Sequence, residues 1–408
     1  MSFIYNNAVK YSDSPNLDAF GRLRTSNVTS LLEYKHTYDK LPLVINEVTA
    51  GTATSVYQKV NSQVVMSVST NNDYVIRQGV ARGIYQPGKG QIFEASFGNF
   101  QLQTNVIKRV GYFTTSTNAP YNTVVDGFFL ESNGQTGIIS FQIWQSGTTT
   151  FSAASTSWST TDYDVTNIDW SKTQLMFTDF QWLGVGRVRF GIVIDGQFKL
   201  FATSTGTNNL NNVYMRAPNQ PVRYEIRSVS VGAAGSFNMI CSRVSLEGTI
   251  NSLQKSSSVT AFTAQTKPTA YVVYPILGYR LNSAYEGANI TLSDIQTINA
   301  TAGAGKADFI VTIQYNPTLS SSSSWTNIPD TPIQYSLSTG QTITTEGHIV
   351  SSFMGTGTGS QVDSYEFKDN MIKPGLKVNG TPDEIWICVK ATSANQDFRA
   401  SINLSYFD

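Results

Sequence analysis

Acidic side chains are the first candidates for chemistry in this sequence, because glycoside hydrolysis needs two carboxyl groups and no histidine. Four of them lie within or beside segments with strand character and could face a common groove: Glu94, Asp126, Glu131 and Asp179. No spacing along the chain selects one pair over the others. We therefore expect the protein not to be an enzyme, and a glycan hydrolase is the alternative that this pattern leaves open.

Histidine and cysteine are too scarce to supply another catalytic centre. The chain contains 2 histidines, His36 and His348, and 2 cysteines, Cys241 and Cys388. Because the two histidines fall in different predicted domains, no Ser–His–Asp arrangement is favoured. Two cysteines cannot build a disulfide framework or a Cys-rich zinc site, and we expect both to be buried, reduced thiols. We assign no catalytic residue and no metal ligand.

Three short motifs resemble ligand-binding sequences, but each lacks an essential part. The segment Asp162–Asp169 offers carboxylates for Ca²⁺ without the glycine and closing glutamate of an EF-hand, so a loop with Asx turns is expected. Gly184-Val-Gly186 precedes a predicted strand, whereas a phosphate-binding glycine pair precedes a helix. Gly303–Lys306 lacks the Ser or Thr that follows the lysine of a P-loop. No cofactor is expected.

Tryptophans offer a different kind of site, because a flat aromatic ring can stack against a sugar. Large aromatic side chains in a sandwich more often belong to the core or to an interface. Both interpretations stay open for five of them: Trp144, Trp158, Trp170, Trp182 and Trp325.

Composition restricts the partners of this chain. Lys+Arg is 28 and Asp+Glu is 28, so the formal net charge is +0, and charged residues make up only 14% of the 408 residues. Without a basic excess we expect no nucleic-acid partner. The N-terminus does not resemble a signal peptide, and no apolar run is long enough to span a membrane, so neither secretion nor a membrane partner is expected.

Short segments rich in Val, Ile, Phe, Tyr and Thr predict β-strands throughout most of the chain. Along 187–194, apolar residues alternate with Arg187 and Arg189, which indicates a half-buried antiparallel strand. Asn133-Gly134 and Asp195-Gly196 predict type I′ hairpin turns. The expected fold is all-β, with two antiparallel, jelly-roll-like β-sandwich domains preceded by an extended N-terminal arm.

The predicted boundaries follow changes in composition. Residues 1–40 form the arm, in which 29–38 has room for a short helical turn. The first sandwich spans 41–250 and the second spans 269–408. Between them, residues 251–268 are small and polar and are interpreted as a linker.

Two blocks of sequence resemble virion structural proteins of tailed bacteriophages. One is Asp18-Ala-Phe-Gly-Arg-Leu-Arg24, and the other extends from Phe180 to Gly196 and contains the letters WLGVGRVRFG. Pro221–Ile226 completes the pattern, whereas residues 262–408 contain no such block. The resemblance implies a structural component of the virion, made in the host cytoplasm and attached to the head, neck or tail.

The same resemblance implies partners. The chain would form a homo-oligomer, with a trimer as the first expectation, and would contact other virion proteins. We expect the arm to dock on a partner through Asp18, Phe20, Arg22, Leu23 and Arg24. Phe20 and Leu23 would fill an apolar pocket, and removal of residues 1–40 would leave a folded protein. The alternative is that the arm packs along its own sandwich.

A second function stays open beside the structural one. A receptor- or glycan-binding tail protein would carry an exposed aromatic patch with Asp or Asn nearby, and the region 262–408 is the expected place for it. The partner would then be a glycan of the host surface.

Overall fold

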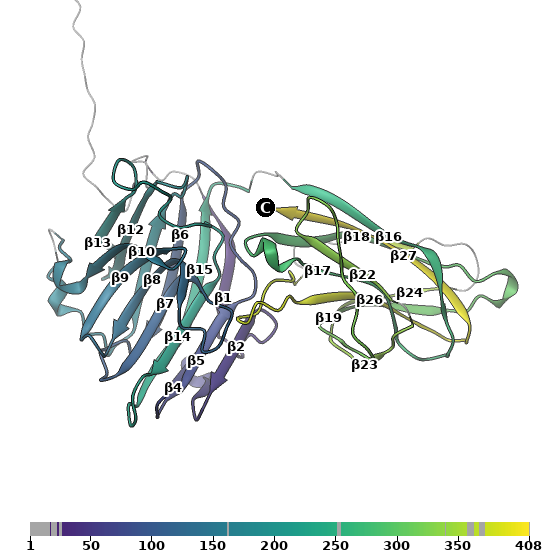
Figure 1. The fold of residues 1–408 in the computed structure, drawn as a ribbon, viewed down its shortest axis with the longest axis horizontal. Helices are drawn as coiled ribbons and strands as arrows, with labels where there is room; N and C mark the ends of the chain where they lie inside the picture. Colours follow the sequence, from purple (N-terminus) through teal and green to yellow (C-terminus); the bar gives the residue numbers. More distant parts are fainter. Residues whose placement is uncertain are drawn as a thin grey trace, which may run out of the picture. The chain divides into compact units, whose positions relative to one another are not determined.

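The computed structural model describes residues 17, 23, 27–160, 163–250, 254–338, 340–356, 363–366 and 372–407. The chain divides into two compact units. One consists of Met1–Gln78, Tyr85–Ser116 and Asn122–Asn251, and the other of Gly79–Ile84, Thr117–Tyr121 and Ser252–Asp408. Both are built from antiparallel strands, so the predicted all-β fold is confirmed (Figure 1).

The first unit is a sandwich of two sheets. One sheet has the strand order β13 (Gln197–Thr205), β12 (Arg187–Ile194), β11 (Gln174–Phe180), β6 (Gln91–Gly98), β15 (Gly235–Glu247), β4 (Gln63–Val68) and β3 (Thr54–Gln58), and β1 (Val28–Lys35) also pairs with β15. The other has the order β10 (Thr148–Ala154), β9 (Ile138–Gln145), β8 (Val124–Asn133), β7 (Val106–Thr115), β14 (Val222–Ser228), β5 (Tyr74–Gly79) and β2 (Ile45–Ala50).

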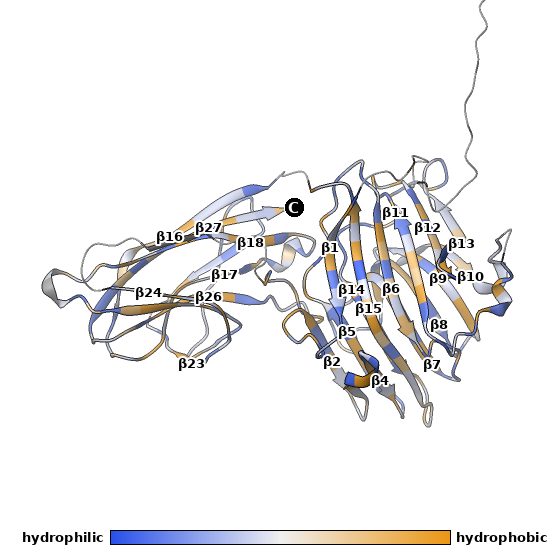
Figure 2. Ribbon diagram, turned by 180° about the vertical axis from the view of Figure 1, so that it is seen from behind, coloured by the Kyte–Doolittle hydropathy of each residue, from blue (hydrophilic) through white to orange (hydrophobic). Residues whose placement is uncertain are grey.

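Aromatic side chains fill the space between these two sheets. Phe93 on β6 lies 6.3 Å, ring centre to ring centre, from Tyr112 on β7. Phe141 on β9 stacks on Phe190 of β12 at 4.7 Å. Apolar and polar residues alternate along many of these strands (Figure 2), so each sheet turns one apolar face toward the other.

The arm prediction is wrong for residues 28–35, which form strand β1 and not a helical turn. This strand pairs with the second half of β15, from Val28 opposite Glu247 to Lys35 opposite Cys241. Leu32 and Tyr34 are buried, which shows the alternation of a strand with one face in the core. Residues 28–35 are therefore an integral part of the first sandwich.

The two predicted hairpins form, but with different turns. Asp195 and Gly196 have φ values of 51° and 73°, the left-handed pair of a type I′ turn, and join β12 to β13. At the other hairpin β8 ends at Asn133 and β9 begins at Ile138, so the loop is longer than predicted. There the Asn133 side chain accepts the N–H groups of Gln135 and Thr136.

The second unit is a smaller sandwich. Its four-stranded sheet has the order β16 (Lys255–Lys267), β27 (Gln396–Phe407), β18 (Asn289–Asn299) and β25 (Asp363–Glu366). Its six-stranded sheet has the order β21 (Thr326–Asn327), β22 (Ile333–Leu337), β17 (Tyr274–Leu281), β26 (Glu384–Ala391), β19 (Phe309–Tyr315) and β24 (His348–Gly355). A two-stranded sheet joins β20 (Thr318–Leu319) to β23 (Ile343–Thr345).

Five single-turn 3-10 helices complete the described structure: η1 (Lys59–Asn61), η2 (Ser155–Ser157), η3 (Val165–Asn167), η4 (Ser283–Tyr285) and η5 (Gly303–Gly305).

The linker prediction is wrong for most of its length, because residues 255–267 are strand β16. It pairs with β27 from Lys255 opposite Tyr406 to Lys267 opposite Gln396. Many of its side chains are exposed, since it is the edge strand of the four-stranded sheet. The small polar composition therefore marks an exposed edge strand.

Candidate functional site

The four carboxylates considered for hydrolysis are each held by protein partners. On the outer face of the eight-stranded sheet, Glu94 accepts a hydrogen bond from Arg243 Nε at 2.8 Å. Asp179 accepts one from Arg189 Nε at 2.9 Å, and both side chains are almost fully buried. These two pairs are cross-strand neighbours in the eight-stranded sheet, whereas Asp126 and Glu131 lie on β8 of the seven-stranded sheet.

Asp126 anchors a loop. Its carboxylate accepts the backbone N–H groups of Arg216 and Ala217 at 2.7 and 2.8 Å and the Gln220 amide at 2.8 Å. A buried carboxylate with three such donors is occupied in holding the backbone. We infer a positioning role for Asp126 within the fold.

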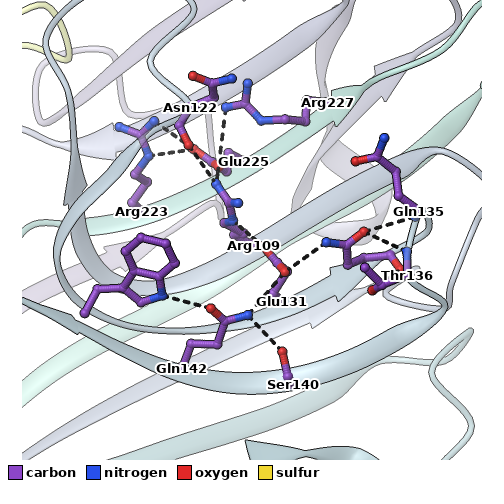
Figure 3. Close-up of polar contacts among 12 residues, drawn as sticks. Arg109, Asn122, Glu131, Gln135, Thr136, Ser140, Gln142, Arg223, Glu225 and Arg227 are labelled. Carbon is purple, nitrogen blue, oxygen red and sulfur yellow. Dashed lines mark hydrogen bonds and ion pairs between the residues drawn. The ribbon is translucent and has the colours of Figure 1, made fainter. Parts of the chain in front are cut away.

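Glu131 belongs to a charged network on the outer face of the seven-stranded sheet, formed by Arg109, Glu131, Arg223, Glu225 and Arg227 (Figure 3). Strand register creates it, because Arg109 on β7 lies directly between Glu131 on β8 and Glu225 on β14. Arg109 Nε lies 2.6 Å from Glu131, and its Nη1 lies 2.9 Å from Glu225. Arg223 and Arg227 also contact Glu225, at 2.7 and 3.4 Å.

The charges in this network fix the ionisation of Glu225. Burial alone would raise the pKa of its carboxyl, but Arg223, Arg227 and Arg109 outweigh burial and lower the pKa from 4.5 to about 2. A general acid for glycoside hydrolysis must carry a proton near neutral pH. Glu225 is instead a permanent anion, which suits a structural role.

Aromatic rings support the same network. Arg109 lies 5.4 Å from the centre of the Phe129 ring, and Arg223 lies 5.5 Å from that of Phe113. The two rings pack on each other at 4.8 Å. Cation–π contacts of this kind strengthen when they are shielded from water.

The histidines and cysteines occupy unlike environments. His36 is buried: its Nδ1–H donates to the Ile240 carbonyl at 2.7 Å, and its Nε2 lies 3.3 Å from Arg77. Burial lowers the pKa of His36, and Arg77 lowers it further against the opposing effect of Ile240.

Cys388 is buried as expected, but Cys241 is exposed on β15, so the prediction of two buried thiols is wrong for Cys241.

Four of the five tryptophans considered as sugar platforms pack against other aromatic rings of the first unit. Trp158 is buried beside Phe201, and Trp170 lies against Phe100. Trp144 and Trp182 have neighbours in Phe129 and Tyr85. Trp325, in the second unit, instead lines an open groove.

The groove at Trp325 has a volume of about 690 Å³, within the range of small-molecule sites. The residues that line it come from the outer face of the six-stranded sheet and from the adjacent loops. They are Arg280, Asn316, Pro317, Thr318, Leu319, Ser321, Ser322, Ser323, Trp325, Lys377, Thr381, Pro382 and Glu384.

Cross-strand register builds the floor of this groove. Gln334, Arg280 and Glu384 are direct neighbours on β22, β17 and β26. Arg280 Nε donates to Gln334 at 2.8 Å, and its Nη1 lies 3.4 Å from Glu384. The guanidinium carbon also lies 4.3 Å from the Trp325 ring centre.

Trp386 and Asn316 fix the groove from the other side. Trp386 is buried next to Trp325, with ring centres 5.5 Å apart, and its Nε1–H donates to Glu384 at 3.0 Å. Asn316 accepts the Glu384 N–H at 2.8 Å and donates to Asp383 at 2.7 Å. The groove thus combines a partly exposed aromatic ring with fixed carboxylate, amide and guanidinium groups, the combination that can hold a polyol.

Of the predicted docking residues, Leu23 lies within the described part of the chain, and Asp18, Phe20, Arg22 and Arg24 lie outside it. Leu23 is 52% exposed and forms an isolated antiparallel bridge with Leu17. Leu17 itself is buried, and its carbonyl accepts a hydrogen bond from Arg189. Leu17 therefore contacts the first sandwich.

No cluster of three or more His, Cys, Asp or Glu side chains suited to a metal ion occurs among the described residues. They also contain no helix that is long and apolar enough to cross a membrane.

Sequence reasoning did not single out Arg109, Glu225, Arg280 or Glu384. The sequence does contain a signal for part of the network, since Arg223-Tyr-Glu-Ile-Arg227 alternates charged and apolar residues. The groove has no comparable signal, because its floor is contributed by strands that are far apart in sequence.

No protein-family model matches the sequence, and no curated protein matches it. Among solved structures, the β-glucanase of Bacillus licheniformis is similar over 54% of this chain and 99% of its own, with 10% identity and a TM-score of 0.36. The exoplasmic/lumenal domain of VIP36, in its Ca²⁺/Man3GlcNAc-bound form, covers 55% of this chain and 91% of its own, with 9% identity and a TM-score of 0.36.

A carbohydrate esterase of the Shiga toxin-encoding bacteriophage phi24B covers 54% of this chain and 100% of its own, with 14% identity and a TM-score of 0.34. Because identity and TM-score are both low, we transfer no functional residue from these proteins to this chain.

Proposed function

We propose that this protein is a carbohydrate-binding component of a tailed-phage particle, and that the groove beside Trp325 is its sugar site. The observation that carries the proposal is the groove itself, in which a partly exposed Trp325 lies beside Arg280, Glu384 and Asn316. Sugars are bound by stacking on a ring and by bidentate polar groups. The phage assignment rests on the resemblance of the arm and of the Phe180–Gly196 block.

Replacement of Trp325 by Ala tests the groove. We expect at least about a tenfold loss of affinity for any glycan that the wild-type protein selects from a glycan array, because an aromatic contact is removed. The matched control is Phe262→Ala, since Phe262 is also an exposed ring beneath an arginine, Arg399, but lies outside the groove.

A second variant guards against a folding defect at Trp325. Ser322→Trp would place a bulky side chain on the exposed wall of the groove and leave Trp325 in place. If both groove variants bound glycan as tightly as the Phe262→Ala control, the groove would not be the sugar site.

A structural role in the virion is the second candidate function. It is favoured by the contact between Leu17, next to the first sequence block, and Arg189, inside the second block. The second block thus contacts the residue that directly precedes the first block, and these two blocks carry the resemblance to virion proteins. In this proposal Leu23, which is exposed, contributes to docking on a virion partner.

A further inference from the structure

The charges that line the Trp325 groove are compensated before any ligand arrives. Arg280 pairs with Glu384 at 3.4 Å. Lys377, which also lines the groove, lies 3.8 Å from the buried carboxylate of Asp383, and Asp383 follows the groove-lining Pro382 in the sequence. Two cations therefore face two carboxylates, and the formal charge of the site is zero.

Glu384 would repel an acidic ligand and retains the capacity to accept hydrogen bonds. One of its oxygens receives Arg280 and the other receives the Trp386 indole N–H at 3.0 Å. A carboxylate offers about four acceptor positions, so about two are left for a ligand. A ligand carboxylate would have to approach this anion closely, whereas a hydroxyl group would donate to it.

Arg280 supplies the complementary donors. Its Nε and Nη1 are used by Gln334 and Glu384, and Nη2 has no protein partner among the described residues. The Trp325 ring and the two side-chain partners hold the guanidinium in one orientation. Donor and acceptor thus stand side by side, the arrangement that matches two adjacent hydroxyl groups of a sugar.

One part of the groove wall is uncharged and rich in hydroxyl groups. Ser321, Ser322 and Ser323 line one part of it, and Thr318 and Thr381 add two more hydroxyls. These side chains both donate and accept hydrogen bonds. None of them carries the positive charge that acidic polysaccharides require for strong binding.

Building on the proposed carbohydrate-binding function, we propose that the groove selects uncharged saccharides with adjacent hydroxyl groups and discriminates against acidic ones, through the Glu384–Arg280 pair.

The experiment compares the full-length protein with two kinds of glycan, neutral oligohexoses such as maltopentaose and cellopentaose and acidic ones such as oligogalacturonate and sialyllactose, at 50 and 500 mM salt. Wild-type protein should bind a neutral saccharide, with an affinity that changes less than about twofold with salt, because no net charge is neutralised. None of the acidic probes should displace the bound neutral saccharide.

Glu384→Gln gives a sharper test. The variant leaves Arg280 without its counter-ion, so affinity for the neutral saccharide should fall about tenfold, as expected for a lost hydrogen bond to a charged group. Affinity for the acidic probes should rise at low salt.

The control is Glu94→Gln, which removes one partner of the pair with Arg243 in the first unit. It should change neither the affinity for the neutral saccharide nor that for the acidic probes.

The outcomes separate this inference from the function on which it rests. Groove-dependent, salt-sensitive binding of acidic glycans by the wild type would overturn the inference and leave carbohydrate binding intact. Absence of binding to every saccharide would overturn both.

Discussion

At the scale of single residues, Glu225 is the side chain on which the outer face of the seven-stranded sheet depends. Three arginines contact it, and two of them are themselves buried. Removing one partner of a buried ionic network leaves the others without compensation, which costs more than the network contributes as a whole. Glu225 should therefore be far less tolerant of substitution than an exposed glutamate in an ion pair.

We predict that Glu225→Gln lowers the free energy of unfolding by about 3–5 kcal/mol, because buried arginines lose their counter-ion. Urea denaturation of wild type and variant at pH 7 measures the difference. The control is Glu94→Gln, whose partner Arg243 is partly exposed, and for which a loss of about 0–1 kcal/mol is expected. Equal losses in the two variants would contradict the structural role of the network.

The pH dependence of the same residue has a definite sign. The pKa of Glu225 is lowered in the folded state, so the unfolded chain binds more protons between pH 4.5 and about 2. Stability from Glu225 is therefore complete above pH 4.5 and lost as pH falls toward 2. The Gln variant should lack this component of acid unfolding.

At the scale of elements, strand β1 belongs to the first sandwich and not to the N-terminal arm. Leu32 and Tyr34 lie in the core, and Thr29 donates to the Gly248 carbonyl at 2.7 Å. Removing residues 1–40 would therefore remove a strand and expose half of the β15 edge, a site for aggregation. Removing residues 1–26 would leave β1 in place.

We predict that the deletion of residues 1–26 yields a soluble, folded protein. Deletion of 1–40 should lower the free energy of unfolding by roughly 3–6 kcal/mol, because it also removes the buried side chains of Leu32, Tyr34 and His36. Thermal unfolding measures the stability of each deletion variant, and size-exclusion chromatography measures its solubility and state of association. The shorter deletion is also the clean test of docking, since failure to enter particles would then reflect the arm and not the fold. Equal stability of the two deletions would rule out β1 as an integral strand.

Strand content was predictable where apolar residues alternate without interruption, as along β12 and at the Asp195-Gly196 turn. It was not predictable for β1, because a bulge between Ser30 and Leu32 breaks the alternation and makes the segment look helical. β16 was missed for another reason: as an edge strand it needs backbone pairing with β27 more than apolar side chains. The groove escaped detection because Arg280, Trp325 and Glu384 meet only through tertiary register.

At the scale of the whole molecule, the two cores are made by separate parts of the chain. The core of the second unit contains buried residues from Val259 to Tyr406. Phe128, by contrast, packs among aromatic residues of the first unit such as Phe93 and Phe180. The Trp325 groove is lined by residues between Arg280 and Glu384, so it depends on the second core.

We predict that Phe128→Leu lowers the free energy of unfolding by about 1–2 kcal/mol, because a core ring is replaced by a smaller side chain. If the groove binds a neutral saccharide as proposed, the affinity of the folded variant for it should stay within twofold of wild type. Calorimetry measures the first quantity and isothermal titration the second. A larger change in affinity would mean that the groove also depends on the first core.

The pairing of β1 with β15 has a consequence for synthesis of the chain on the ribosome. The contact from Thr29 to Gly248 spans 219 residues. At about 5–20 residues per second, β1 waits roughly 10–40 s before its partner emerges. During that interval Leu32 and Tyr34 have no core to enter, and the alternating Glu33 and Lys35 keep the nascent strand in solution. The first sandwich can thus close only near the end of its own translation, when the strand made first meets the strand made last.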